Sequence, residues 1–290
     1  MSDDPRKELA EISRSVRRSL ERERAAGLGE LLVSAAARAR GTGAFAAAGN
    51  PASVSDEPDG LEPSGRSLFE EATEALPSFH PPLYPKGIEA RAAIAMTAEP
   101  LLAAIAEEVK VCEKCALSKL RTLAVPGVGS AKSGIVFVGE GPGADEDRLG
   151  EPFVGRAGQL LDRIILAMDE AKLIPGVPLN RGTVFIGNIV HCRPPENRVP
   201  LPHEVEMSSP YLLRQIDAIK PRIICCLGKT AAELLLGMKG ALGGMRGKVY
   251  RFHGAKLIVT YHPAACLRNP AYKRPVWEDM QLLAREYQAD

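Results

Sequence analysis

Side chains able to do chemistry follow three short apolar runs of this sequence. GIVFV precedes the loop GEGPGADEDRLGEPFVGRAG at 139–158, TVFIGNIV runs into HCRPPENR at 191–198, and KLIVT precedes YHPAACLRNP at 261–270. Such runs predict strands, and open α/β sheets bind ligands at the edge where their strands end. We therefore expect the three loops to meet at one crevice.

The residue types in these loops predict a pocket for a base. Asn188 carries an amide that can pair with the edge of a planar heterocycle, and Phe153 carries a ring that can stack on its face. His262 can donate a hydrogen bond to an oxygen that gains negative charge. GEGPG lacks the lysine of a phosphate-binding loop, and its glycines instead allow the backbone to approach a ligand closely.

The elements that must position these loops alternate between strands and helices. A helix near residue 98 is followed by strands over GIVFVG, TVFIGNIV, RIICCLG, VYRF and KLIVT, and by helices over 156–170, about 203–218, KTAAELLLG and about 275–287. Nearly continuous apolar strands among helices indicate a sheet covered on both faces. The sequence predicts an α/β fold, a three-layer α/β/α sandwich around a mainly parallel four-stranded central sheet.

Motifs in the three loops resemble those of the family 4, iron–sulfur uracil-DNA glycosylases. They read GEGPGxxED with PFVGxAGQLL, N-x3-CRPPxNR, and YHPAAxLRNP, and the resemblance runs from about residue 98 to about residue 288. It implies the fold of those enzymes and a role in DNA base excision repair. Such an enzyme flips uracil out of DNA and hydrolyses its N-glycosidic bond, which leaves an abasic site. Uracil-containing DNA is then the expected partner.

The resemblance also implies which residues hold the base. Those expected to bind uracil are Glu140, Gly141, Pro142, Phe153, Asn188 and His262. Asn188 is expected to donate to uracil O4 and to accept from N3–H, a pattern that cytosine reverses. His262 is expected to be catalytic, because it can donate to O2 while the base leaves with negative charge.

The attacking water and the entry into DNA involve other residues. Gly141 stands where relatives in the wider superfamily hold the water with an Asp, which leaves Glu140, Glu146 and Asp147 as the available carboxylates. The resemblance favours Glu140 for this role, with Glu146 as the second candidate. Capping of a helix is the other interpretation of Glu146. Leu267 or Arg268 is expected to be the wedge that fills the space of the flipped nucleotide.

A metal site is expected where two cysteines share one turn. VCEKC places Cys112 and Cys115 at the spacing with which two thiolates reach the same metal. The resemblance adds Cys192 as a third ligand of a [4Fe–4S] cluster, and Ser208 stands at the family's fourth cysteine position. We expect a structural cluster that Ser208, solvent or another residue completes. A zinc site that recruits a nearby histidine, or no metal, are the alternatives.

Composition indicates where in the cell the protein is located and how it can bind DNA. No apolar run is long enough to span a membrane and the N-terminus lacks the apolar core of a signal peptide, so we expect a cytoplasmic protein. Six cysteines in such a protein favour metal ligands or buried thiols over disulfides. With a net charge of +1, DNA binding needs local basic patches, for which the candidates are Arg246, Lys248, Arg251, Arg268, Lys273 and Arg274.

The chain divides into three parts. Residues 1–40 predict a helical or weakly ordered extension, residues 41–95 a disordered linker rich in Pro, Gly, Ser and Ala, and residues 96–290 the catalytic domain. The extension is a candidate docking element for a replication or repair protein. We expect a monomer that does not bind membranes.

A second interpretation is a non-catalytic nucleic-acid-binding module of the same fold with a degenerate metal site. A pure binding module has no need of Glu140, Asn188 and His262 together, so their presence favours the enzyme. A covalent relative that traps the abasic product is disfavoured, because no insert rich in Arg and His follows PFVGRAGQLL.

Overall fold

A six-stranded sheet in the order β1-β3-β2-β4-β6-β5 forms the centre of the computed structural model, which describes residues 84–289. The strands are β1 Val128–Gly129, β2 Ile135–Gly139, β3 Phe185–Asn188, β4 Ile223–Leu227, β5 Val249–Phe252 and β6 Ala255–Thr260. The four inner strands pair in parallel, whereas β1 and β5 pair antiparallel at the two edges. The predicted parallel four-stranded centre is confirmed, with an antiparallel strand added at each edge.

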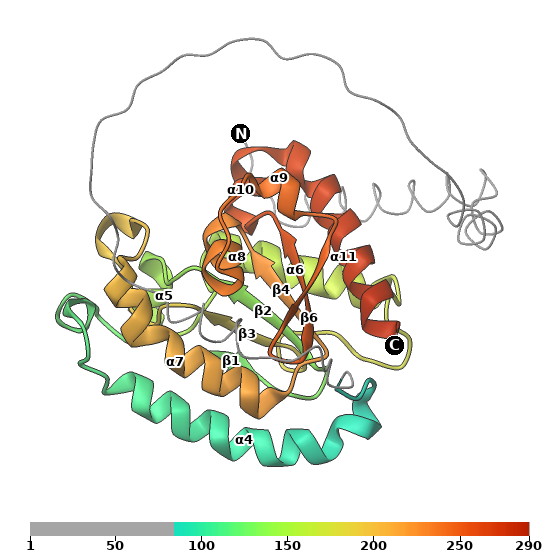
Figure 1. The fold of residues 1–290 in the computed structure, drawn as a ribbon, viewed down its shortest axis with the longest axis horizontal. Helices are drawn as coiled ribbons and strands as arrows, with labels where there is room; N and C mark the ends of the chain where they lie inside the picture. Colours follow the sequence, from blue (N-terminus) through green and yellow to red (C-terminus); the bar gives the residue numbers. More distant parts are fainter. Residues whose placement is uncertain (1–83, 290) are drawn as a thin grey trace, which may run out of the picture. The chain divides into compact units, whose positions relative to one another are not determined.

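Helices cover both faces of this sheet (Figure 1). They are α4 Ile88–Lys110, α5 Ala144–Leu149, α6 Arg156–Glu170, α7 Pro202–Ile219, α8 Lys229–Leu236, α9 Leu242–Met245, α10 Pro263–Arg268 and α11 Lys273–Gln288, with short 3-10 turns at η1 Ala116–Lys119, η2 Pro195–Asn197 and η3 Pro270–Tyr272. Most of these helices have an apolar face that must be buried, and the sheet offers two faces for it.

Alternate residues of the inner strands belong to two separate apolar clusters. Val136 and Val138 of β2 pack with α4, α7 and α8, whereas Ile135 and Phe137 pack with α6 and α11. Side chains of successive strand residues point to opposite faces, so both faces of β2 are buried. This arrangement confirms the predicted α/β/α sandwich.

The first described helix begins earlier than the sequence predicts. α4 begins at Ile88, inside the segment 41–95 that we expect to be a linker, and its Arg91 is fully buried. The linker therefore cannot extend to 95. The rest of that segment up to 83 lies outside the described residues, as do the extension over 1–40 and its proposed docking role.

Buried arginines tie α4 and the last helix to the amino edge of the sheet. Arg91 donates to the carbonyl oxygens of Ala131, Ile219 and Lys220 at 2.7–3.0 Å, and to that of Pro85 at 3.2 Å. Arg222, which precedes β4, donates to the carbonyl groups of Tyr84, Tyr287 and Ala289.

None of the helices between residues 84 and 289 is long and apolar enough to cross a membrane.

Candidate active site

The ends of β2 and β3 bring an amide and an aromatic ring together. Gly139 and Asn188 are the last residues of these two parallel strands and lie opposite each other. A Cβ atom placed on Gly139 would lie 2.4 Å from Asn188 Oδ1 and 2.7 Å from Phe153 Cζ. The amide and the ring can therefore lie over the end of β2 only because Gly139 has no side chain. The sequence analysis names Asn188 and Phe153 but not Gly139. Its position directly after the apolar run GIVFV could have indicated it.

Asn188 presents an oxygen without a partner. The residue is only 2 % exposed, and its Oδ1 accepts no hydrogen bond from the residues that the structure describes. A buried polar atom without a hydrogen bond is costly, so a partner such as a water molecule or a ligand is expected for it. This oxygen can accept a hydrogen bond from a ring N–H placed over Gly139.

Phe153 is held in an unusual backbone conformation. Its φ angle is 54°, a region that residues with a side chain rarely adopt. Arg181 donates to the Phe153 carbonyl oxygen at 3.2 Å and also to that of Pro152, and it forms an ion pair with Asp162 at 3.1 Å. A Cβ atom on Gly158 would lie 1.8 Å from the Phe153 oxygen, so α6 approaches this turn closely. Together these contacts keep the ring at the strand ends.

His262 caps α10 and lies beside Phe153. The two ring centroids are 5.6 Å apart and the planes are inclined by 32°. The Ala264 N–H donates to His262 Nδ1 at 3.1 Å, so a neutral imidazole carries its proton on Nε2. Burial lowers the pKa of His262 to about 4, and the positive charge of Arg268 adds to this effect against the opposing charge of Glu146. His262 is therefore a neutral donor at neutral pH.

Glu146 joins the two halves of the first motif loop. One carboxylate oxygen accepts from the Gly143 N–H at 3.1 Å, and the other accepts from the Val154 and Gly155 N–H groups at 2.9 and 3.0 Å. It thereby caps α5 and holds the turn next to Phe153. The capping interpretation of Glu146 is confirmed, while its catalytic role stays a prediction.

Glu140 continues the pairing with the segment after β3 beyond the end of β2. The Glu140 carbonyl oxygen accepts from the Val190 N–H at 3.1 Å, and the Glu140 side chain is half-buried. A Cβ atom on Gly141 would lie 2.6 Å from Val190 Cγ2, and Pro142 is buried. The close packing of this loop requires Gly141. Uracil contacts of Glu140, Gly141 and Pro142 stay predictions.

The two wedge candidates lie at the end of α10. Leu267 is half-buried and Arg268 is exposed, and α10 packs against α6. Arg268 is close enough to His262 to affect its pKa, so the end of α10 lies near His262. Which of the two side chains enters DNA stays a prediction.

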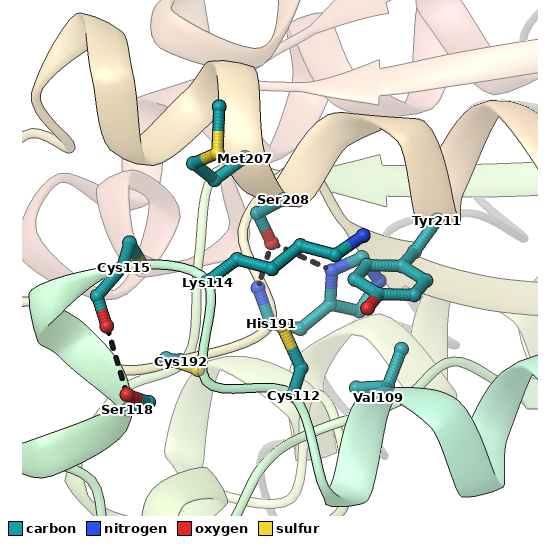
Figure 2. A pocket seen from close by; sticks show the side chains of 10 residues that line it. All are labelled: Val109, Cys112, Lys114, Cys115, Ser118, His191, Cys192, Met207, Ser208 and Tyr211. Atoms are coloured by element: carbon teal, nitrogen blue, oxygen red, sulfur yellow. Dashed lines mark hydrogen bonds between the residues drawn. The ribbon is translucent and has the colours of Figure 1, made fainter.

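A pocket brings the three predicted thiols together (Figure 2). Its lining includes Cys112 and Cys115 from the turn after α4 and Cys192 from the loop after β3. Arg121 donates to Cys192 Sγ at 3.1 Å and opposes the effect of burial, which raises the pKa of this thiol. A nearby guanidinium favours the thiolate form that metals bind. The remaining cysteines, Cys225, Cys226 and Cys266, are buried.

Ser208 faces this pocket from α7 but is hydrogen-bonded to His191. Its Oγ accepts from the His191 backbone N–H at 3.1 Å and lies 2.9 Å from His191 Nδ1, as the dashed lines of Figure 2 show. With one backbone donor already bound, the hydroxyl can donate its own proton to Nδ1. Burial lowers the pKa of His191 to about 4, so this ring is neutral.

Three of the residues that line this pocket have the donor type of iron–sulfur ligands. Three thiols line it, which is the donor type that such clusters use, while the fourth position offers only the engaged hydroxyl of Ser208. Within residues 84–289, no three His, Cys, Asp or Glu side chains converge closely enough to hold a single ion.

Comparisons with known proteins agree with this fold and pocket. Residues 126–281, more than half of the chain, match the uracil DNA glycosylase superfamily. A type-4 uracil-DNA glycosylase of Pyrobaculum aerophilum is 45 % identical over 184 residues, which cover 61 % of this chain and 89 % of that protein. Its counterpart in Saccharolobus solfataricus is 46 % identical over 61 % of this chain and 82 % of its own length. That of Thermotoga maritima is 41 % identical, over 64 % and 94 %.

The mainly parallel sheet and the helices on both of its faces define an α/β protein, with Asn188 and Phe153 at the carboxyl ends of its inner strands. The chain belongs to the uracil-DNA glycosylase superfamily, and within it to the type-4 uracil-DNA glycosylases. The family that its loop motifs indicate is confirmed.

Proposed function

We infer that this chain removes uracil from DNA by hydrolysing the N-glycosidic bond, as a DNA glycosylase of base excision repair. The observation that carries this inference is the juxtaposition over Gly139 of the Asn188 oxygen and the Phe153 ring, with His262 beside that ring. The relatives named type-4 uracil-DNA glycosylases support the same activity.

Recognition of uracil is assigned to Asn188 and Phe153. Asn188 Oδ1, which has no donor in the described part of the chain, accepts from uracil N3–H, and the amide NH2 of the same side chain donates to O4. The Phe153 ring, fixed by Arg181 and Gly158, stacks on the base. Cytosine has an acceptor at N3 and a donor at N4, so it would leave Asn188 with two mismatched contacts.

Bond cleavage is assigned to His262 and Glu140. The bond between N1 and C1′ breaks with positive charge on the sugar and negative charge on the base. The N–H of neutral His262 donates to uracil O2 and stabilises this negative charge. Glu140 positions the water that adds to C1′, because the oxygens of Glu146 already accept from three backbone N–H groups. An oxocarbenium-like state needs little general-base help, so holding the water in place suffices.

Entry of the base into the pocket requires that the nucleotide leave the duplex. Flipping costs a few kcal/mol, which an inserted side chain offsets. Leu267 and Arg268, at the end of α10, are the side chains proposed for this insertion. The partner is uracil-containing DNA in the cytoplasm, bound by a monomer. A protein partner for residues 1–40 stays part of the proposal.

The cofactor proposed for the cysteine pocket is a [4Fe–4S] cluster, with zinc as the alternative. Cys112, Cys115 and Cys192 would hold it, with Ser208 at the fourth position. When bound, it would supply a structural cross-link between the segment before β2 and the loop after β3. No step of uracil excision depends on it.

Replacement of Ser208 tests the cofactor. A cluster with a weak fourth ligand is lost more easily than one with four thiolates, so Ser208→Cys should raise the iron and sulfide content and slow bleaching in air. Ser208→Ala is the matched control, since it removes the hydroxyl and adds no thiol. The measurements are visible absorption of anaerobically purified protein and assays of iron, sulfide and zinc. Wild-type protein with full, stable iron occupancy would instead require a fourth ligand other than Ser208.

Excision itself is tested with labelled oligonucleotides that carry one uracil, one cytosine or only thymine at the same position. We expect an alkali-labile site at uracil alone, without added metal or nucleotide. The His262→Ala protein, purified in the same way, controls for a contaminating glycosylase. Folded protein that binds the uracil strand but leaves it intact would refute the proposed function and favour the non-catalytic binding module.

A further inference from the structure

Arg246 and Asp279 form a buried ion pair behind the loop that carries His262. Arg246 follows α9 and Asp279 lies in α11, and Arg246 Nε is 2.7 Å from Asp279 Oδ2. The two side chains are 15 % and 4 % exposed. Arg246 is one of the basic residues expected to contact DNA, but these contacts direct its guanidinium into the protein.

The ion pair contacts Thr260 and Tyr261, the two residues that directly precede His262. Asp279 Oδ2 also accepts from Thr260 Oγ1 at 2.6 Å, and Thr260 is the fully buried last residue of β6. The Arg246 guanidinium lies 4.5 Å from the centre of the Tyr261 ring, at a distance typical of a cation–π contact. Tyr261 in turn stacks on Tyr272, with centroids 4.2 Å apart and planes inclined by 13°.

The guanidinium itself is fixed at a second point. A terminal nitrogen of Arg246 donates to the Pro275 carbonyl oxygen at 2.7 Å, in the first turn of α11. Burial raises the pKa of Asp279, while the hydrogen bonds from Arg246 and Thr260 oppose that shift. The three groups therefore depend on one another, because a buried charge that loses its partner is costly.

We propose that Arg246 and Asp279 are positioning residues for His262. The side chains of Thr260 and Tyr261 are held on one side of His262, and the Ala264 N–H holds its ring on the other. The direction of the Nε2–H bond then follows from the path of the backbone between these points. A donor displaced by about 1 Å can cost on the order of a hundredfold in rate.

This inference rests on the proposed function, and a double-mutant cycle with His262→Ala tests it. Arg246→Met in the wild-type background should lower the single-turnover excision rate by about ten- to hundredfold and leave DNA affinity unchanged. In the His262→Ala background the same substitution should change the remaining rate by no more than about twofold. Arg246→Lys, which keeps the charge but not the planar group over Tyr261, should give an intermediate rate.

Two variants keep the test decisive. Arg214→Met removes an exposed ion pair with Glu108 on α4 and should leave the rate unchanged in both backgrounds. If Arg246→Met does not fold, Thr260→Val replaces it in the same cycle, because it removes only the hydroxyl that donates to Asp279.

Three results separate the possibilities. Equal losses of rate in both backgrounds would overturn the inference, because Arg246 would then act independently of His262. Loss of DNA affinity in proportion to rate would also overturn it and return Arg246 to the DNA surface. If His262→Ala alone leaves the rate unchanged, the catalytic assignment of the proposed function fails, and Arg246 cannot act through it.

Discussion

Asn188 is buried and its side-chain oxygen has no donor among residues 84–289, which is why substitutions there should affect specificity. Asn188→Asp replaces the donating NH2 with an acceptor, so it opposes uracil O4 and suits cytosine N4. We expect the uracil rate to fall by roughly ten- to hundredfold, from about 1–3 kcal/mol of lost pairing, and the ratio of uracil to cytosine cleavage to fall with it.

Asn188→Ala is the control for this prediction, since it removes the uracil contacts without creating one for cytosine. Excision rates on matched uracil and cytosine oligonucleotides supply the measurement. If both variants lose uracil activity with the same ratio of uracil to cytosine cleavage, Asn188 is not the residue that reads the base.

His262 should act as a neutral donor over the whole physiological pH range. Its pKa is lowered to about 4 in the folded protein, so the ring stays neutral as the pH falls through 6.5, the usual value for histidine. Single-turnover excision should therefore show no inflection near pH 6.5 that depends on this residue. The folded state also resists protonation that the unfolded chain accepts, so this group lowers stability as the pH falls from about 6.5 to about 4.

The matching variant is His262→Gln, which keeps a neutral donor that cannot titrate. Rates of the wild type and of His262→Gln should have the same pH dependence between pH 5 and 8, with a lower rate for the variant. A wild-type inflection near pH 6.5 that is missing in His262→Gln would mean that His262 titrates normally.

At the scale of elements, Glu146 makes the first motif loop and the turn after Pro152 into one unit. Glu146→Gln cannot accept from all three backbone donors, because one oxygen becomes an NH2 group. We expect the free energy of unfolding to fall by about 2 kcal/mol, and the excision rate to fall because Phe153 is displaced. Glu140→Gln should lower the rate with little change in stability.

Denaturant unfolding and single-turnover rates of both variants distinguish the two carboxylates. A Glu146→Gln protein that is as stable as the wild type but inactive would mean that Glu146, rather than Glu140, holds the water. The same measurements on Arg181→Met would show whether the turn at Phe153 also needs the hydrogen bonds that Arg181 donates to it.

At the scale of the whole molecule, Arg91 connects α4 to segments that lie far away in the sequence. Burial lowers its pKa to about 10, and its donors serve carbonyl groups before β2 and after α7. Arg91→Met should lower the free energy of unfolding by about 3 kcal/mol, because four carbonyl groups lose their donor.

Arg214→Met is the comparison, because Arg214 also connects to α4 but through an exposed ion pair with Glu108. Exposed pairs are worth about 0–1 kcal/mol, so this variant should remain close to the wild type. Denaturant unfolding measures both. Equal stabilities of the two variants would contradict the role that we assign to Arg91.

The sequence by itself determines the succession of strands and helices and the loops that carry the chemistry. Local apolar periodicity specifies which side of a strand or helix is buried, so α6 has the predicted bounds 156–170 and the parallel strands are the expected ones. The motifs around Asn188 and His262 also indicate the family, because each of them is a continuous stretch of the sequence.

Only the tertiary structure decides which partner each side chain meets. The contact between Gly139, Asn188 and Phe153 joins three segments, and Ser208 lies against His191 because α7 packs over the loop after β3. Arg246 changes from a presumed surface cation to the buried partner of Asp279. Residue type and spacing do not specify such pairs, because they depend on how elements distant in the sequence pack against each other.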